Sequence, residues 1–256
     1  MCLIVLALDA HPRHRLVVAA NRDEFYARPT APAAWWSDAP SVLAGRDLQE
    51  GGTWMGVTRA GRFAAITNYR ETAPPRPDAP SRGALVAGFL RGTMEARAYA
   101  GEVAARGAAY NGFNLLVGDG GGVFYVSNRA EGVHRLEPGV YGLSNALLDT
   151  PWPKVQRARA AMQSALASPE ADGWESGLWE MLGDRVIAAD DHLPDTGVGA
   201  DRERLLSAPF IVSDVYGTRA STVLTMGRDG EVAFVERSAT PDGPGEARHR
   251  FRIGEP

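Results

Sequence analysis

The chain has 256 residues, of which 45% are hydrophobic, so it is long enough to bury a large core. Its formal net charge of −4, from 27 basic and 31 acidic residues, offers no basic field, so neither nucleic acid nor an anionic membrane surface is expected as a partner. No apolar run reaches the roughly 18 residues of a membrane-spanning helix. A single cysteine excludes an internal disulfide framework. We therefore expect a cytoplasmic protein without integral membrane association.

Two apolar runs open the chain, at residues 2–8 and 15–20, and a short polar turn separates them. Because neither run alternates with polar residues, we predict two buried antiparallel strands that are covered on both faces. Residues 25–52 are rich in Pro, Gly and Trp, which predicts a long irregular loop. Short β-rich runs predict further strands at residues 53–58, 62–68, 113–117, 123–126 and 141–145.

Helical patterns lie between these strands. We predict helices at residues 81–90 and 93–110, capped by Ser81 and Thr93, and two more at 153–167 and 173–190. The last third is β-rich again, with predicted strands at 210–213, 222–226 and 231–236, a loop at 238–245 and an edge strand at 248–253. With hairpin connections and neither an internal repeat nor a linker, this order suggests one α+β domain over residues 1–256, with two stacked antiparallel sheets and helices outside.

The only cysteine, Cys2, directly follows Met1 and is the candidate nucleophile. The alternative interpretation is a small hydrophobe in a buried strand. If Met1 is removed, one residue carries both a thiol, with a pKa of about 8.5, and an amine, with a pKa of about 8 that lets it take the thiol proton. This chemistry needs no histidine. The five histidines lie in turns, polar stretches or an edge segment, where we expect them at the surface, and no spacing resembles a metal site.

The segment from Asn21 to Glu24 ends the strand beside Cys2, where a plain polar turn is the alternative interpretation. In the functional interpretation, Asp23 holds the α-ammonium or orients it as a base. Arg22 and Glu24 then point to the other face of the strand, because side chains alternate, and they pair or line an entrance for substrate. Asn21 is a further candidate for substrate binding.

Two asparagines at strand ends, Asn68 and Asn145, are candidates for stabilising an oxyanion, although asparagine is also a common turn residue. Arg219 lies in a polar segment, residues 216–222, between two apolar strands. That segment is either a hairpin turn, or it brings Arg219 to Asp23 or to a substrate carboxylate.

Together these motifs resemble the NRDE-motif family, whose eukaryotic members are called transport and Golgi organisation protein 2. The resemblance covers nearly the whole chain and rests on the segments Met1-Cys2-Leu3-Ile4, Ala20-Asn21-Arg22-Asp23-Glu24, Gly45-Arg46-Asp47, Gly51-Gly52-Thr53-Trp54, Thr67-Asn68-Tyr69-Arg70, Ser81-Arg82-Gly83, Leu143-Ser144-Asn145 and Gly217-Thr218-Arg219.

That family is similar to N-terminal nucleophile (Ntn) hydrolases of the bile-salt hydrolase and penicillin acylase type, which implies a four-layer αββα sandwich. The resemblance implies that Cys2 is the nucleophile, that Asp23 supports the amino terminus, and that Arg219 is the site arginine. It makes Asn68 and Asn145 the oxyanion candidates. One residue departs from the pattern, because Ala20 stands where the bile-salt enzymes usually carry an arginine.

The resulting expectation is an amidohydrolase, or a thioester hydrolase or acyltransferase, that acts on a small acyl substrate through an acyl-enzyme on Cys2 and needs no cofactor. Trp54 and Tyr69 are the expected substrate-binding aromatics. The alternative is a non-catalytic carrier or chaperone for haem, acyl-lipid or coenzyme A in the same cleft, with Trp35, Trp36, Trp54 and Tyr69 as its walls. Core packing is the competing explanation for these rings. The sequence carries no signal for an oligomeric state.

Overall fold

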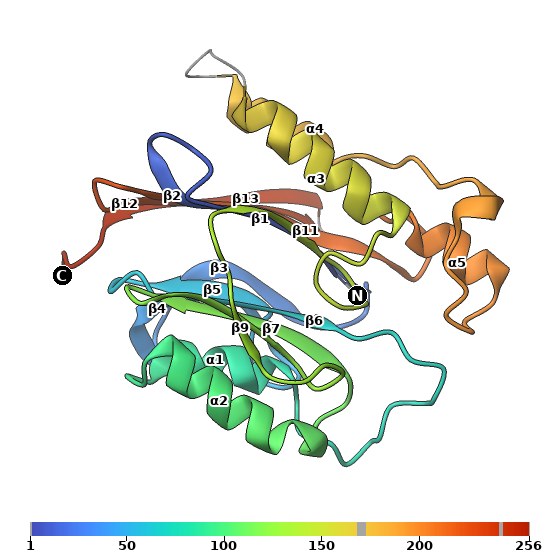
Figure 1. Ribbon diagram of the computed structural model, residues 1–256, viewed down its shortest axis with the longest axis horizontal. Helices are drawn as coiled ribbons and strands as arrows, with labels where there is room; N and C mark the ends of the chain where they lie inside the picture. The colour runs from blue at the N-terminus through green and yellow to red at the C-terminus, as the bar shows by residue number, and fades with distance from the viewer. Residues whose placement is uncertain (1, 168–172, 241–242, 256) are drawn as a thin grey trace.

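The structure is a computed structural model that describes residues 2–167, 173–240 and 243–255. These residues form two antiparallel sheets (Figure 1). The strands of the first, sheet A, are β1 (Cys2–Leu8), β2 (His14–Phe25), β10 (Gly139–Leu143), β11 (Tyr216–Gly227), β12 (Glu231–Thr240) and β13 (Gly243–Arg252). Those of the second, sheet B, are β3 (Thr30–Trp36), β4 (Ala39–Asp47), β5 (Met55–Thr58), β6 (Phe63–Asn68), β7 (Phe113–Asp119), β8 (Gly122–Ser127) and β9 (Val133–Arg135).

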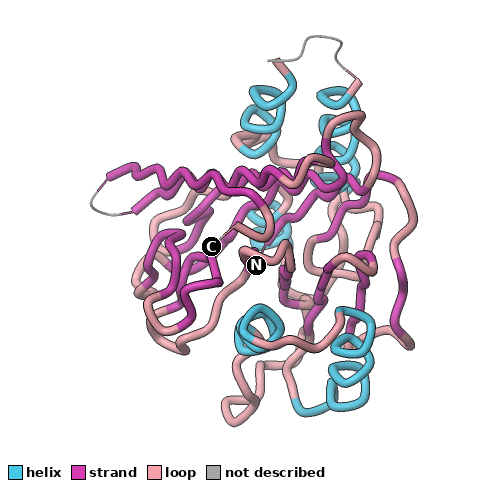
Figure 2. Tube along the Cα trace, turned by 90° about the vertical axis from the view of Figure 1, so that its left-hand side faces the viewer, coloured by secondary structure: helices cyan, strands magenta, loops and turns pink. Residues whose placement is uncertain are grey.

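Helices cover the outer face of each sheet (Figures 1 and 2). The α-helices in the described residues are α1 (Gly83–Arg91), α2 (Ala96–Arg106), α3 (Pro153–Leu166), α4 (Trp174–Leu182) and α5 (Ala200–Leu206). Sheet A has the strand order β10-β1-β2-β11-β12-β13 and lies under α3 and α4, whereas sheet B runs from β3 to β9 in chain order and lies over α1 and α2. The described residues therefore form the predicted four-layer αββα sandwich.

The alternation of side chains along β1 explains its unbroken apolar run. Leu3 and Val5 pack under α3 and α4, while Ile4 and Leu6 lie in the core between the two sheets. Both faces of the strand are thus covered, which is what the lack of polar alternation predicted. No helix of the described residues has the length and apolar character needed to cross a membrane.

The prediction of an irregular loop at residues 25–52 is wrong, because β3 and β4 occupy most of that segment. Its prolines misled the prediction, since β3 is an edge strand and an edge strand tolerates a residue that cannot donate a ladder hydrogen bond. The β3–β4 pairing also shifts register twice, between Ala31 and Ala34 and between Trp35 and Trp36. These irregularities weaken the alternating pattern by which a strand is recognised.

The last third departs from prediction at three places. Residues 210–213 form no strand, and residues 216–222 are the first half of β11 rather than a turn. The predicted loop at 238–245 belongs largely to the long β12–β13 hairpin, which Figure 2 shows extending past the sandwich; residues 241–242 lie outside the described residues. The predicted edge strand is confirmed, although it begins earlier, at Gly243.

The helices are shorter than predicted and are capped differently. Neither Ser81 nor Thr93 caps a helix, since α1 and α2 begin two or more residues later without a side-chain cap from their own N-cap residue. Instead, the Asp119 carboxylate at the end of β7 accepts the Ala96 N–H at 2.6 Å, which satisfies an unpaired donor of α2. Helix α4 ends at Leu182, and α5 was not predicted.

Candidate active site

Cys2 opens into a small polar pocket of about 270 Å³ between the two sheets. The pocket combines the starts of β1 and α1 with the ends of β2 and β6. Its charged lining residues are Arg22, Asp23, Glu24, Arg28, Asp47, Glu50 and Arg82. Trp54 and Asn68 complete the part of the wall nearest to the predicted chemistry. The structure thus brings six of the predicted site residues to one cavity.

The β1–β2 pairing sets the position of the nucleophile candidate. Cys2 stands directly opposite Arg22 in the antiparallel register, so both side chains project from the same face of sheet A. The Cys2 carbonyl accepts a hydrogen bond from the Ser144 hydroxyl at 2.9 Å, which ties the start of β1 to the end of β10. The predicted removal of Met1 concerns a residue outside the described ones.

The Cys2 thiol is half-buried and free of any disulfide. Burial raises its pKa above the ordinary range, the Asp23 carboxylate raises the pKa further, and the Arg22 guanidinium lowers it. At neutral pH the thiol is therefore protonated, and it needs a base before it can attack.

Asp23 is buried. Because side chains alternate along β2, its carboxylate points toward α3, on the opposite face of sheet A from the Arg22 side chain. Its Oδ1 accepts a hydrogen bond from the Thr218 hydroxyl at 2.6 Å, and Thr218 is its direct neighbour on β11. Burial raises the pKa of Asp23, and the positive charge of Lys154 is the largest influence that lowers it. The carboxylate is thus held rigidly beside the start of β1, where it can support an amino terminus.

Lys154 was not predicted as a site residue. It lies in the first turn of α3, is 2% exposed, and its Nζ has no hydrogen-bond acceptor among the described residues. Burial lowers its pKa to about 8, while the charges of Asp23 and Cys2 raise it. The helical period indicates this burial, because Lys154 and Ala158 are four residues apart and therefore lie on the same, core-facing side of α3.

Asn68 and Asn145 are in contact, but only Asn68 lines the pocket. The half-buried Asn68 lines the pocket, whereas Asn145 is fully buried. Asn145 Nδ2 donates to the Asn68 backbone carbonyl at 2.9 Å, and the Asn145 carbonyl accepts the Arg70 N–H at 2.7 Å. The side chain that faces the cavity is therefore that of Asn68, and Asn145 fixes its backbone.

Arg219 lies behind the pocket and is not part of its lining. A register shift between Thr218 and Ala220 makes Arg219 the extra residue of a β-bulge. Its Nη1 lies 3.0, 3.0 and 2.9 Å from three backbone carbonyl oxygens of the turn after β2, those of Phe25, Tyr26 and Arg28. Arg219 thus holds this turn and makes no ion pair with Asp23.

Arg22 and Glu24 line the pocket together with Trp54. The Arg22 guanidinium lies 4.3 Å from the centre of the Trp54 ring and 3.9 Å from a Glu24 carboxylate oxygen. Arg28, which the sequence did not single out, pairs with Asp47 at 2.6 Å across the mouth of the pocket.

Asn21 and Tyr69 do not line the pocket. The Asn21 amide donates to the carbonyls of Leu182 and Pro209, both at 2.8 Å, and its oxygen accepts the Ser221 hydroxyl at 2.7 Å. All three partners lie toward the helices, on the far side of sheet A from the pocket. Asn21 therefore clamps β2 to the segment that follows α4.

Of the aromatic residues considered as walls of a carrier cleft, only Trp54 lines the pocket. Trp36 is buried in the core beneath α1 and α2, and its Nε1 donates to the Ala44 carbonyl at 3.1 Å. Trp35 packs against Phe251 of β13, with ring centroids 5.0 Å apart. These two rings serve core packing.

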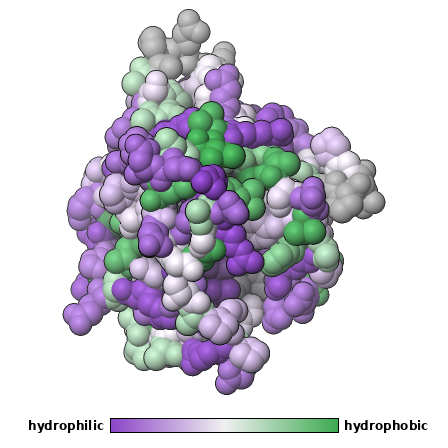
Figure 3. Space-filling model, turned by 90° about the vertical axis from the view of Figure 1, so that its right-hand side faces the viewer, coloured by the Kyte–Doolittle hydropathy of each residue, from purple (hydrophilic) through white to green (hydrophobic). Residues whose placement is uncertain are grey.

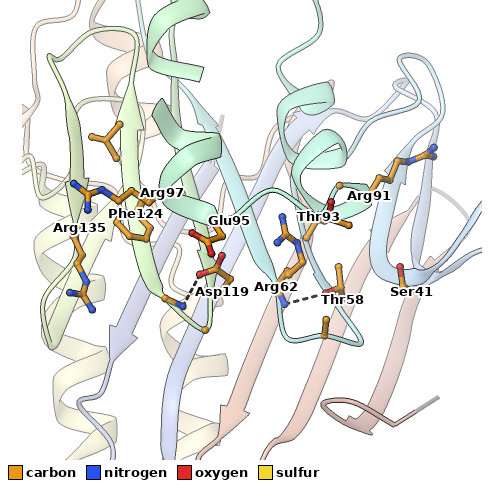
Figure 4. A pocket seen from close by; sticks show the side chains of 16 residues that line it. Ser41, Thr58, Arg62, Arg91, Thr93, Glu95, Arg97, Asp119, Phe124 and Arg135 are labelled. Atoms are coloured by element: carbon orange, nitrogen blue, oxygen red, sulfur yellow. Dashed lines mark hydrogen bonds between the residues drawn. The ribbon is translucent and has the colours of Figure 1, made fainter. Parts of the chain in front are cut away.

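A larger pocket, of about 940 Å³, lies between the α1–α2 connection and the β7–β8 turn and shares no lining residue with the Cys2 pocket (Figure 4). Two of its charged side chains bond to backbone groups. Asp119 accepts the N–H groups of Ala96 and Gly121, and Arg62 donates to the carbonyls of Phe89 and Met94. The lining residues of this pocket include neither a cysteine nor a histidine.

The described residues contain no group of three or more His, Cys, Asp or Glu side chains placed to bind a metal ion.

One histidine is not at the surface as predicted, because His11 is 7% exposed and packs against His14 and Trp174. Its Nδ1 accepts the N–H groups of Arg13 and His14, so it stabilises the β1–β2 turn.

Comparisons with known proteins agree with this architecture. The solved structure of a mutant of the conjugated bile acid hydrolase from Clostridium perfringens superposes with a TM-score of 0.52 over 98% of this chain and 97% of that chain, at 9% sequence identity. At that identity the likeness concerns the fold alone.

Sequence relatives are much closer. The Transport and Golgi organization protein 2 homolog of Bos taurus is 37% identical over 277 residues, covering 99% of both chains, and the Homo sapiens homolog is 37% identical over 260 residues, covering 93% of both. The profile of the family described as Transport and Golgi organisation 2 matches residues 1–241. The chain belongs to the Transport and Golgi organisation 2 family.

Proposed function

We propose that this protein is an N-terminal-cysteine hydrolase or acyltransferase that cleaves amide or thioester bonds of small acyl substrates after Met1 is removed. The observation that carries the proposal is the position of Cys2, with its thiol in a polar pocket beside the Asn68 side chain and the buried Asp23 carboxylate next to the start of its strand. A nucleophile, an oxyanion donor and a group to hold the amine are the three parts that acyl transfer requires.

The reaction begins with the proton of the Cys2 thiol. Because burial raises the pKa of this thiol, a base must remove the proton, and the α-amine of a processed Cys2 is the nearest group with a suitable pKa. The sulfur attacks the substrate carbonyl, and the Asn68 amide donates to the oxyanion. The amine returns the proton to the departing amine or thiol, and water or another amine then releases the acyl group from Cys2.

Pocket size and surroundings favour an acyl substrate that is only partly enclosed. A volume of about 270 Å³ lies just below the usual range for enclosed ligand sites. Phe25 follows the pocket residue Glu24 and is 57% exposed, and Val215 nearby is 65% exposed. Figure 3 shows apolar side chains gathered on the half of this face that belongs to sheet A and its helices. An acyl chain that leaves the pocket can lie on this surface.

Intact-mass spectrometry tests the proposal. The purified protein should lack Met1 and should gain one acyl group when it is mixed with a short acyl thioester or an activated amide. Because Cys2 is the only cysteine, Cys2→Ala should remove this mass increase completely. Asn68→Ala should slow its appearance by about a hundredfold, as the loss of one oxyanion donor does elsewhere. Retention of Met1 in the active protein, or acylation that survives Cys2→Ala, would sink the proposal.

A further inference from the structure

Arg82 is the cation of the Cys2 pocket with the fewest partners. The two other arginines of the lining each face a carboxylate: Arg28 pairs with Asp47 at 2.6 Å, and Arg22 lies 3.9 Å from Glu24. Within the ranges that the structure describes, Arg82 makes no ion pair with a carboxylate. Its positive charge is therefore not balanced by a bonded acid.

The donors of Arg82 are also largely available. Its one hydrogen bond to the described residues runs from Nη1 to the Gly112 carbonyl at 3.1 Å, whereas a guanidinium carries five N–H donors. Burial lowers the pKa of Arg82 from its ordinary value, and the charges of an ionised Cys2 and of the more distant Glu24 and Glu71 raise it. The group stays protonated at neutral pH, so a partly desolvated cation faces the nucleophile with donors to spare.

Two glycines hold Arg82 in this position. A Cβ on Gly52 would lie 2.6 Å from the carbonyl carbon of Gly83, so the two backbones touch and no side chain fits between them. The Thr53 N–H donates to the Gly83 carbonyl at 3.3 Å. The segment with Gly52 and the segment with Arg82 are thus packed against each other. Because the backbone at Arg82 is already ordered, binding a ligand to its guanidinium costs little further conformational entropy.

We propose that Arg82 binds an oxyanion, a carboxylate or a phosphate, that the substrate carries close to the bond attacked by Cys2. The inference rests on the proposed function and names its substrate class as anionic acyl compounds. The pocket volume of about 270 Å³ lies just below the usual range for ligand sites. That space admits a reacting carbonyl with its anionic group, while the rest of the substrate lies outside.

Alkylation of the single cysteine tests this without a known substrate. Iodoacetate and iodoacetamide have nearly the same size, and only the first is an anion. The rate of alkylation by iodoacetate is divided by the rate with iodoacetamide, both for Cys2, read by intact mass, and for free glutathione. This ratio should be about tenfold higher for Cys2, which is the effect of one charge-assisted hydrogen bond. Arg82→Gln should bring the ratio down to that of glutathione, and Arg82→Lys should keep part of the excess. Arg97→Gln, which removes an exposed arginine of the other pocket, should leave the ratio unchanged.

Protection separates the two kinds of oxyanion. At constant ionic strength, acetate or inorganic phosphate should slow alkylation by iodoacetamide in the wild type and not in Arg82→Gln, and the stronger protector identifies the preferred group. Protection by neither, or an iodoacetate preference that persists in Arg82→Gln, would overturn the assignment. Both readouts are independent of acyl transfer, so an intact preference without an acyl-enzyme would count against the proposed function alone.

Discussion

Alternation along β2 divides the site residue by residue. Arg22 faces sheet B, where it lies over Trp54, while the neighbouring Asn21 and Asp23 face the helices. The period of two in a strand predicted this division between Arg22 and Asp23. It could not predict Arg82 or Lys154, which do not lie on strands. The helical period indicates that Lys154 faces the core, but which groups Arg82 and Lys154 approach depends on how α1 and α3 pack on the sheets.

Lys154 should make stability depend on alkaline pH. Its pKa in the folded protein is lowered to about 8 by burial, whereas an unfolded chain keeps the ordinary value of about 10.4. Between these values the unfolded state binds more protons, so the free energy of unfolding should rise with pH. In urea unfolding at pH 7.5, 8.5 and 9.5, the free energy of unfolding of the wild type should rise relative to that of Lys154→Met by at most about 1.4 kcal/mol per pH unit.

A matched control for this prediction is Arg157→Met, which alters an exposed residue of the same helix. It should leave the pH dependence of unfolding unchanged. A constant difference between wild type and Lys154→Met across this pH range would mean that Lys154 stays charged in the folded protein throughout, because only equal proton binding by the folded and unfolded states removes the pH dependence. In that case burial would not lower its pKa as described.

At the scale of elements, apolar runs predicted most strands of the core and missed strands whose pairing is irregular or whose sequence is polar. The continuous runs of β1 and β2 are recognisable because both faces are buried. The irregular β3–β4 pair and the polar first half of β11 are not, because a bulge and an exposed edge remove the pattern. The same holds for the site. A β-bulge sets the position of Arg219, and a bulge cannot be recognised from the alternation of residues in the sequence.

The bulge at Arg219 should contribute to stability. Arg219→Met removes the donor to three part-buried carbonyls of the turn after β2, and the loss of hydrogen bonds from a charged donor costs about 1.5–3 kcal/mol. Thermal and urea unfolding measure the loss. Arg228→Met, which breaks an exposed ion pair with Asp9, should change stability by less than about 1 kcal/mol. Equal effects of the two substitutions would contradict a structural role for the bulge.

At the scale of the whole molecule, Glu236 joins the two sheets. Its carboxyl group on β12 accepts the Ala33 N–H of β3 at 2.8 Å. Burial raises the pKa of Glu236 to about 7, while hydrogen bonds from Ala33 and Thr222 oppose this rise. The neutral acid therefore suits the interface between the sheets, and ionisation at higher pH places an unfavourable charge there.

This sets the sign of a second pH dependence. Because the pKa is raised on folding, the stability contributed by Glu236 should be complete below about pH 4.3 and lost as the pH rises through about 7. Glu236→Gln keeps the acceptor oxygen and cannot ionise, so it should match the wild type most closely at pH 4 and exceed it by a few kcal/mol at most, about 3, at pH 8. The same difference at both pH values, measured by urea unfolding, would show that Glu236 does not titrate in this range.

The exposed strand β13 has a consequence for the behaviour of the protein in concentrated solution. It ends sheet A, and its solvent-facing positions carry charges at Glu246, Arg248, Arg250 and Arg252, while Phe251 and His249 turn inward against Trp35. A neighbouring molecule that added a strand here would have to bring its own backbone against this row of charges. The longest open edge of the fold is thereby protected from growing into an intermolecular sheet, and the protein can keep its β-rich architecture without aggregating through it.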